Sequence, residues 1–228
     1  MTTRELFFTS TGQVRAGWRA LLFCGLAWAF YKLAFVLIFL IGRPSSSALF
    51  QLEAYLIVLL GIWFAHYIML RWVDHAPWSY VGLGRENLAP RVLVLGFALG
   101  ALCILLPSGT LLVAHDLTIT TGLQGSHSWF GLAVAGAAIF LPQSLGEEMV
   151  TRGYLFAALR DAIGWWGALF ATSLGFGLLH YANPGANVRS VSVVILAGVF
   201  LGAILIATRS LYAAWMAHFA WNWSMAEV

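Results

Sequence analysis

The chain has 228 residues, of which 61% are apolar and only 9% are charged. Its mean hydropathy is +0.85, far above that of soluble domains, in which about a quarter of residues are charged. This composition excludes a soluble globular protein and predicts an all-α, polytopic transmembrane helical bundle. The net charge of +3 does not indicate a nucleic-acid partner, because the bases stand at the ends of apolar runs, where they orient a chain in a membrane.

The apolar runs predict about seven membrane spans, since about 20 residues are needed to cross a hydrocarbon core roughly 30 Å thick. In chain order we expect spans at 20–41, 48–70, 91–113, 129–151, 164–182, 188–208 and 211–225. The first run lacks a small-residue cleavage site, so it is interpreted as a retained signal-anchor. Residues 1–228 are expected to form one membrane domain, with an N-terminal three-helix part at 20–114 and a motif-bearing four-helix core at 129–225.

The distribution of basic residues predicts the orientation of the chain. Nine bases belong to the N-terminal tail and to alternate loops: Arg4, Arg15, Arg19, Arg71, Arg85, Arg91, Arg152, Arg160 and Arg209. The opposite side has only Arg43 and Arg189, and Lys32 lies within the first span. Because loops rich in Lys and Arg stay in the cytoplasm, we expect a cytoplasmic N-terminus and, after an odd number of spans, a C-terminus outside.

Small residues mark how some spans pack. Gly96 with Gly100, and Gly198 with Gly202, have the spacing that lets two helix backbones approach closely. Pro142 precedes a pair of carboxylates and is expected, with Gly146, to loosen the fourth span. Such breaks are tolerated where the backbone lines a cavity in the protein.

The two adjacent carboxylates, Glu147 and Glu148, stand in a stretch that otherwise reads as buried in the membrane. A charge in hydrocarbon is costly, so an ionisable residue inside a span usually faces a protein interior and has a partner. Arg152 lies one helical turn after Glu148, where it can neutralise that carboxylate. Glu147 then has no such partner and is the candidate catalyst.

Two further polar pairs occur in later spans. His180 follows Phe176 by four residues and Asn222 follows His218 by four, so the members of each pair share one helix face. From the cytoplasmic ends of the spans, a rise of ~1.5 Å per residue puts Glu147 and Asn222 at a depth of ~18 Å, His180 at ~22 Å and His218 at ~12 Å. These four side chains are therefore expected to converge on one polar cavity.

This set of side chains suits a hydrolase that activates water. A carboxylate in an apolar pocket can take a proton from water, an imidazole can orient that water, and a second histidine with an amide can donate to an oxyanion. Each residue alone would more commonly be a hydrogen-bonded packing residue, and Glu148 with Arg152 alone would be a structural pair. The coincidence of three patterns at one depth favours the catalytic interpretation.

The sequence resembles the CPBP family, the abortive-infection and CAAX prenyl endopeptidase-like intramembrane proteases. The three motifs that carry the resemblance, EExxxR, FxxxH and HxxxN, are intact within residues 147–222. By this similarity Glu147 is the base that activates water, His180 helps to hold the water, and His218 with Asn222 forms the oxyanion site. The segment 15–19 also looks like that of bacterial members, which implies a bacterial inner (plasma) membrane.

The resemblance further implies residues that shape the site without reacting: Glu148, Arg152 and Phe176. Family members are described both as metalloproteases and as glutamate-dependent hydrolases without a metal. No HExxH pattern is present, and we favour a site without a cofactor. If zinc is bound instead, its ligands would be Glu147, His180 and His218.

The expected partners are membrane lipids and a hydrophobic or lipid-bearing peptide or protein substrate, cleaved within the membrane. An alternative is a non-proteolytic immunity, scaffold or transport protein that uses the same polar cluster for binding or proton relay. A transporter would be expected to contain broken helices in both halves of the chain, and only one break, near Pro142, is predicted. Substitution of Glu147 by Gln distinguishes the two, because only a protease depends on that carboxylate.

Overall fold

The computed structural model describes residues 3–41, 48–118 and 129–227, and within these ranges the chain is helical and has no strand. A short helix α1 (Thr3–Phe7) comes first. The long helices are α2 (Ala16–Ile41), α3 (Ala48–Ile68), α4 (Pro90–Val113), α5 (Trp129–Glu148), α6 (Tyr154–Leu179), α7 (Val188–Thr208) and α8 (Leu211–Glu227). Short 3-10 turns at Trp78–Val81 and Arg85–Asn87 connect α3 to α4. The expected all-α bundle is confirmed.

The number of membrane passes depends on a reversal of the chain at Gly164. Among the described residues, five helical stretches are long and apolar enough to cross a membrane: Ala16–Leu40, Ala48–Val73, Pro90–Val113, Trp129–Ala182 and Val188–Thr208. The fourth stretch turns back at Gly164, whose φ of 75° lies in the left-handed region that glycine adopts readily. This stretch therefore makes two passes, and α8 adds 17 further helical residues. The arrangement agrees with about seven spans.

The predicted end of the fourth span at residue 151 differs from the structure, in which the chain reverses later, at Gly164. Residue 151 does not end the helical stretch, because a π-helix at Met149–Gly153 joins α5 to α6, with a change of backbone angles at Gly153 (φ −81°, ψ −119°). The helix also passes through Pro142 without ending, so the irregularity follows the carboxylates instead of preceding them. Arg152, which was counted as a loop base, is 1% exposed inside this helix. Its charge is neutralised there, which is why the helix can continue.

Two of the basic residues that were counted to predict the orientation do not lie in exposed loops. Arg19, counted with the N-terminal tail, is buried within α2 and pairs with Asp74 at 3.0 Å. Arg19 and Arg152 are thus held inside the protein, while Arg43 lies outside the described residues. The cytoplasmic N-terminus remains a prediction that rests on the other bases.

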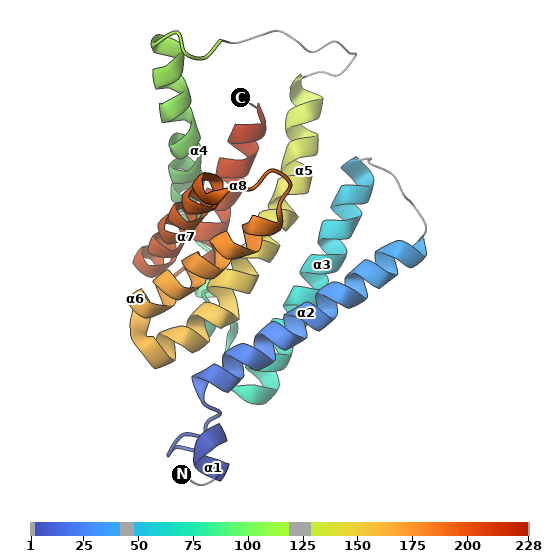
Figure 1. Cartoon of the computed structure of the whole chain (residues 1–228), viewed down its shortest axis with the longest axis vertical. Coiled ribbons are helices and arrows are strands. Elements are labelled where there is room, and N and C mark those ends of the chain that lie inside the picture. The colour runs from blue at the N-terminus through green and yellow to red at the C-terminus, as the bar shows by residue number, and fades with distance from the viewer. Residues whose placement is uncertain (1–2, 42–47, 119–128, 228) are drawn as a thin grey trace.

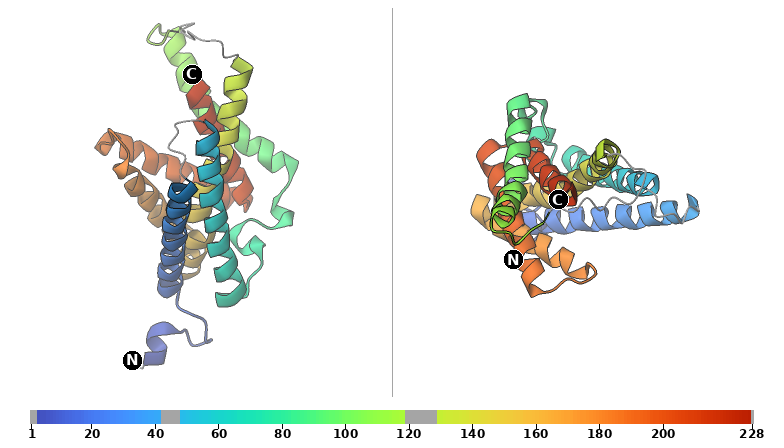
Figure 2. Two further views of the ribbon diagram at one scale, coloured as in Figure 1. Left: turned by 90° about the vertical axis from the view of Figure 1, so that its right-hand side faces the viewer. Right: turned by 90° about the horizontal axis from the view of Figure 1, so that it is seen from above.

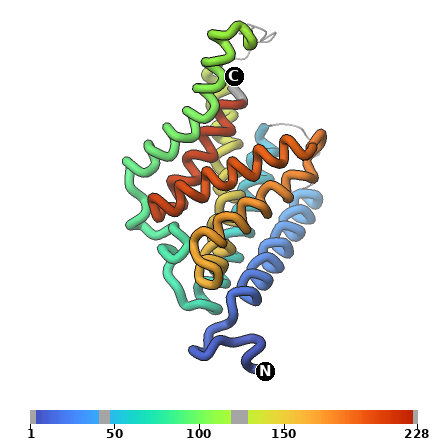
Figure 3. The backbone as a smooth tube through the Cα atoms, turned by 60° about the vertical axis from the view of Figure 1, so that its left-hand side comes forward, coloured from blue at the N-terminus to red at the C-terminus, as the bar shows by residue number. Residues whose placement is uncertain are grey.

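Some helices that pack together are consecutive in the chain, and others are far apart in sequence. Helix α2 packs on α3, α4 on α8 and α6 on α7, and α5 lies between α3 and α8 (Figure 1). A side view shows α2 beside α3 and places the described ends of the chain at opposite ends of the bundle (Figure 2). The pairing of α4 with α8 is clear in Figure 3, although the two helices are far apart in sequence. The central position of α5 allows several helices to reach its carboxylates.

The outer surface of the bundle is apolar, as expected where helices face lipid. Large apolar side chains project from several helices, among them Phe39 at 77% exposure, Phe130 at 78% and Leu196 at 67%. Buried polar side chains gather instead where α3, α5, α6 and α8 meet, and they include His66, Ser144, Glu148, Arg152, Ser173 and His218. The bundle thus holds a buried polar cluster within an otherwise apolar interior and surface.

Glycines set the close crossing of α4 and α8. A Cβ atom at Gly96 would lie 2.3 Å from the carbonyl oxygen of Ala213, and one at Gly100 would lie 2.0 Å from that of Ala217. Both obstacles are backbone atoms, which cannot rotate away as a side chain could. The spacing noted in the sequence therefore serves direct backbone approach.

We expect Gly100→Ala to lower the free energy of unfolding by about 1–3 kcal/mol, because the added methyl group forces α4 away from α8. The matched control is Gly109→Ala in the same helix, where a Cβ atom would meet nothing within 4 Å. That substitution should be neutral or slightly stabilising, since alanine favours a helix. Thermal unfolding of the purified proteins in detergent compares them. Equal melting temperatures would show that the crossing tolerates a methyl group.

Candidate active site

A fully buried ion pair joins the end of α5 to the π-helix. Arg152 Nη1 lies 2.7 Å from Glu148 Oε1, and both side chains are 0% exposed. The same nitrogen donates to Thr151 Oγ1 at 2.9 Å, and Nη2 donates to the carbonyl oxygen of Gly198 on α7 at 3.2 Å. The pairing expected from the i, i+4 spacing is present. It also ties α5 to α7.

The π-helix is supported by His66, to which sequence reasoning assigns no role. His66 Nε2 accepts a hydrogen bond from the backbone N–H of Tyr154, the first residue after the π-helix, at 3.2 Å. Its Nδ1 lies 2.9 Å from the carbonyl oxygen of Ile62. A Cβ atom at Gly153 would lie 2.4 Å from His66 Nε2, so the glycine makes room for the imidazole. The only signal in the sequence was an ionisable residue in an apolar run.

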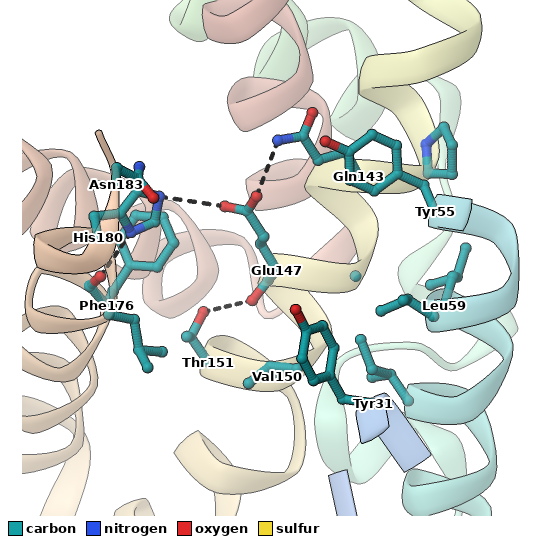
Figure 4. Close-up of a pocket in the computed structure, with 15 residues that line it drawn as sticks. Tyr31, Tyr55, Leu59, Gln143, Glu147, Val150, Thr151, Phe176, His180 and Asn183 are labelled. Carbon is teal, nitrogen blue, oxygen red and sulfur yellow. Dashed lines mark hydrogen bonds and ion pairs between the residues drawn. The ribbon is translucent and has the colours of Figure 1, made fainter. Parts of the chain in front are cut away.

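The neighbouring carboxylate, Glu147, faces an open space. Its Oε2 lies 3.8 Å from His180 Nε2 and 3.7 Å from His218 Nε2, while Gln143 Nε2 donates to its Oε1 at 3.3 Å. The Glu147 side chain is 30% exposed, whereas that of Glu148 is 0% exposed. Figure 4 shows the carboxylate directed between Gln143 and His180. Gln143 was missed by sequence reasoning, although its position one turn before Glu147 allows this contact.

His180 is oriented by its own helix. Its Nδ1 lies 2.8 Å from the carbonyl oxygen of Phe176, and because a carbonyl only accepts, Nδ1 carries the proton. In the neutral ring Nε2 is then an acceptor, and it faces Glu147. The Phe176 ring packs edge-on against His180 at 4.5 Å and against His218 at 5.8 Å, and the Arg152 guanidinium lies 4.3 Å above it. Phe176 thus separates the buried pair from His180.

His218 lies between the two carboxylates. Its Nδ1 is 2.8 Å from Glu148 Oε1, and its Nε2 is 3.7 Å from Glu147 Oε2. The second member of its motif, Asn222, lines a cavity together with His180 and His218. Helices α5 and α8 and the 3-10 turn His180–Ala182 at the end of α6 therefore bring Glu147, His180 and His218 together, with Asn222 on the adjoining cavity wall. Their catalytic roles remain predictions.

Two cavities flank this cluster and share Phe176 and His180. The first, of about 310 Å³, lies between α2, α3, α5 and α6, and its walls include Tyr31, Tyr55, Leu59, Pro142 and Leu179 (Figure 4). The second, of about 520 Å³, lies between α4, α7 and α8, and its walls include Ile104, Arg189, Val193, Trp221 and Asn222. The accessible wall of each cavity is mostly apolar, and the shared residues Phe176 and His180 place both cavities next to the polar cluster.

Among the described residues, no group of three or more His, Cys, Asp or Glu side chains is arranged to hold a metal ion. The candidate zinc ligands Glu147, His180 and His218 are close, but the nearest N···O separations are 3.7 and 3.8 Å. The cofactor-free site remains a prediction.

Comparison with known families agrees with the motifs. The model described as type II CAAX prenyl endopeptidase Rce1-like matches residues 128–224, the segment that carries Glu147, His180 and His218. Searches of curated proteins and of solved structures found no match. The resemblance inferred from the three motifs is confirmed over residues 128–224, and together with the apolar helices it indicates an integral membrane protein.

Arg152→Ala is expected to lower the free energy of unfolding by about 3–5 kcal/mol, because it leaves Glu148 as a buried charge without its cation. The melting temperature in detergent should fall accordingly. Arg85→Ala, which removes an exposed arginine, is the control and should have little effect. A normal melting temperature for Arg152→Ala would mean that Glu148 does not carry a charge in need of compensation.

Proposed function

We propose that this chain, whose residues 128–224 match the Rce1-like family, is an intramembrane endopeptidase in which Glu147 activates the attacking water. One observation carries the proposal. Glu147 Oε2 lies within 3.8 Å of the Nε2 atoms of both His180 and His218, which come from different helices, and the site opens into cavities. A purely structural ion pair would be inaccessible to solvent, as the pair of Glu148 and Arg152 is.

The water would lie between Glu147 and His180. Their separation of 3.8 Å is too long for a direct hydrogen bond, and a gap of this kind is commonly bridged by a water molecule. Such a water would donate one hydrogen to Glu147 and the other to His180 Nε2, which leaves a lone pair for attack on a carbonyl carbon. Gln143 holds the other oxygen of Glu147 and so fixes the direction of the carboxylate.

His218 and Asn222 would stabilise the oxyanion. The Nδ1 of His218 donates to Glu148, so a His218 that also donates through Nε2 would carry protons on both nitrogens. Because Arg152 neutralises Glu148, the remaining charges of Glu147 and His218 balance each other. As Glu147 takes the proton of the water, negative charge moves to the oxyanion beside His218, and the cluster stays balanced.

The proton on Glu147 would then complete the reaction. The water oxygen bonds to the carbonyl carbon, the peptide C–N bond breaks, and Glu147 passes its proton to the departing nitrogen. The two apolar cavities suit a substrate that is itself apolar on both sides of the scissile bond. We therefore propose a membrane-embedded or lipid-bearing peptide as the substrate class.

Glu147→Gln is expected to reduce hydrolysis by about 10²–10⁴-fold, because it keeps the shape of the side chain but removes the proton acceptor. The assay uses liposomes containing the protein and a fluorogenic peptide, supplied either farnesylated or unmodified. The matched control is Glu53→Gln, a carboxylate in α3 that lines neither cavity. Hydrolysis that survives Glu147→Gln would contradict the proposed base. If the cellular role also survived, the non-proteolytic alternative would be favoured.

Metal removal tests the cofactor-free mechanism. With Glu147 as the base and no metal, dialysis against a strong chelator should leave the rate of wild-type hydrolysis unchanged. If zinc participates, stripping should abolish activity, restored zinc should return it, and metal analysis should find about one zinc per chain. X-ray absorption should then give Zn–N and Zn–O distances of about 2.0–2.2 Å, and loss of bound zinc on substitution of Glu147, His180 or His218 would assign them as ligands.

A further inference from the structure

A separate polar cavity lies at the end of the bundle that carries the N-terminus. Its volume is about 220 Å³, and it is enclosed by the 3-10 turns after α3, the first part of α6 and the end of α7. None of its lining residues lines either cavity beside Glu147. The polar and aromatic part of its wall comprises Tyr80, Asn87, Arg152, Arg160, Trp165 and Arg209. The proposed hydrolysis makes no direct use of this space.

Three arginines in one small cavity are unusual unless their charges are compensated. Arg152 is paired with Glu148, and Arg160 is paired with Asp161 at 3.0 Å. Arg209 forms no ion pair with any carboxylate in the part of the chain that the structure describes. The cavity therefore carries positive charge that the protein does not balance locally.

The Arg209 side chain is held at this cavity by its surroundings. Its guanidinium lies 3.7 Å from the centre of the Trp165 ring, and that of Arg160 lies 5.1 Å from the same ring. The backbone of Arg209 has a φ of 57°, at the end of α7, where glycine is the residue that adopts this conformation without strain. The carbonyl oxygen of Arg209 accepts a hydrogen bond from Asn87 Nδ2 at 2.9 Å. A strained backbone thus presents a guanidinium to the cavity.

The exposed guanidinium in this wall is that of Arg209, whereas Arg152 is 1% exposed and is engaged by Glu148. An anion in the cavity would bring acceptor oxygens to Arg209, which has no carboxylate partner among the described residues.

We propose that this cavity binds a phosphate group, supplied either by the headgroup of an anionic lipid or as free phosphate. Guanidinium groups bind phosphate oxygens in pairs, and two of them stacked on one indole are already ordered for this purpose. Trp166, exposed at 66% beside Trp165, is the kind of residue found at the level of lipid headgroups. Bound phosphate would join the turn of α6 to the end of α7.

The test measures the melting temperature of the full chain in nanodiscs of phosphatidylcholine, with and without phosphatidylglycerol. The anionic lipid is expected to raise the melting temperature of the wild type by about 3–6 °C, as for a site near saturation. Arg209→Gln should lose most of this increment, and Arg209→Lys, which keeps the charge without the fork of donors, should lose part of it. Arg91→Gln removes an exposed arginine outside the cavity and should keep the increment.

Inorganic phosphate added to phosphatidylcholine nanodiscs distinguishes the two sources. A similar increment, again lost in Arg209→Gln, would assign the site to free phosphate, whereas an increment with phosphatidylglycerol alone would assign it to the lipid. The proposal is overturned if neither addition stabilises the wild type, or if Arg209→Gln and Arg91→Gln respond alike. Because the readout is stability, the result is independent of whether the chain hydrolyses peptides.

Discussion

The buried pair of Glu148 and Arg152 is the interaction on which the rest of the site depends. Both side chains are inaccessible, and within hydrocarbon neither charge could remain without the other. Mutual neutralisation allows α5 to continue through the carboxylates into α6. It also fixes positions beyond the pair, because Glu148 holds His218 Nδ1 and Arg152 reaches the carbonyl oxygen of Gly198. One ion pair thus connects α5, α7 and α8.

The same pair explains how two adjacent glutamates can have different roles. Successive residues on a helix point about 100° apart, so Glu148 faces the protein interior while Glu147 faces the cavities. The side chain of Glu147 is 30% exposed and its nearest basic groups are imidazoles at 3.7 and 3.8 Å. A carboxylate in this position can exchange a proton with a substrate or a water. A carboxylate fixed by an arginine at 2.7 Å cannot do so readily.

Local patterns in the sequence predicted what short-range geometry determines. The apolar runs gave helices, the spacing of Glu148 and Arg152 gave their pair, and three motifs indicated a convergence that the structure places around Glu147. Contacts between distant segments were not predictable in this way. His66 reaches Tyr154 across 88 residues, and the π-helix it supports has no signature of its own. The reversal at Gly164 depended on one glycine among many in the chain.

The region after the π-helix shows how the site is anchored at one end. Tyr154 donates its backbone N–H to His66 on α3 and its hydroxyl to Asp74, which also binds Arg19 of α2.

Tyr80 joins this network through Arg19 and Asp161. Burial, aided by the hydrogen bond to Asp161, raises the pKa of Tyr80 to about 12, so the phenol stays a donor at neutral pH. These hydrogen bonds and ion pairs therefore connect the start of α2 and the end of α3 to the start of α6. Farther along the same helices, Tyr31 and Tyr55 line the cavity that opens beside Glu147. A polar anchor at one end and an apolar cavity beyond it allow one pair of helices both to hold the π-helix in place and to form a wall of the cavity beside Glu147.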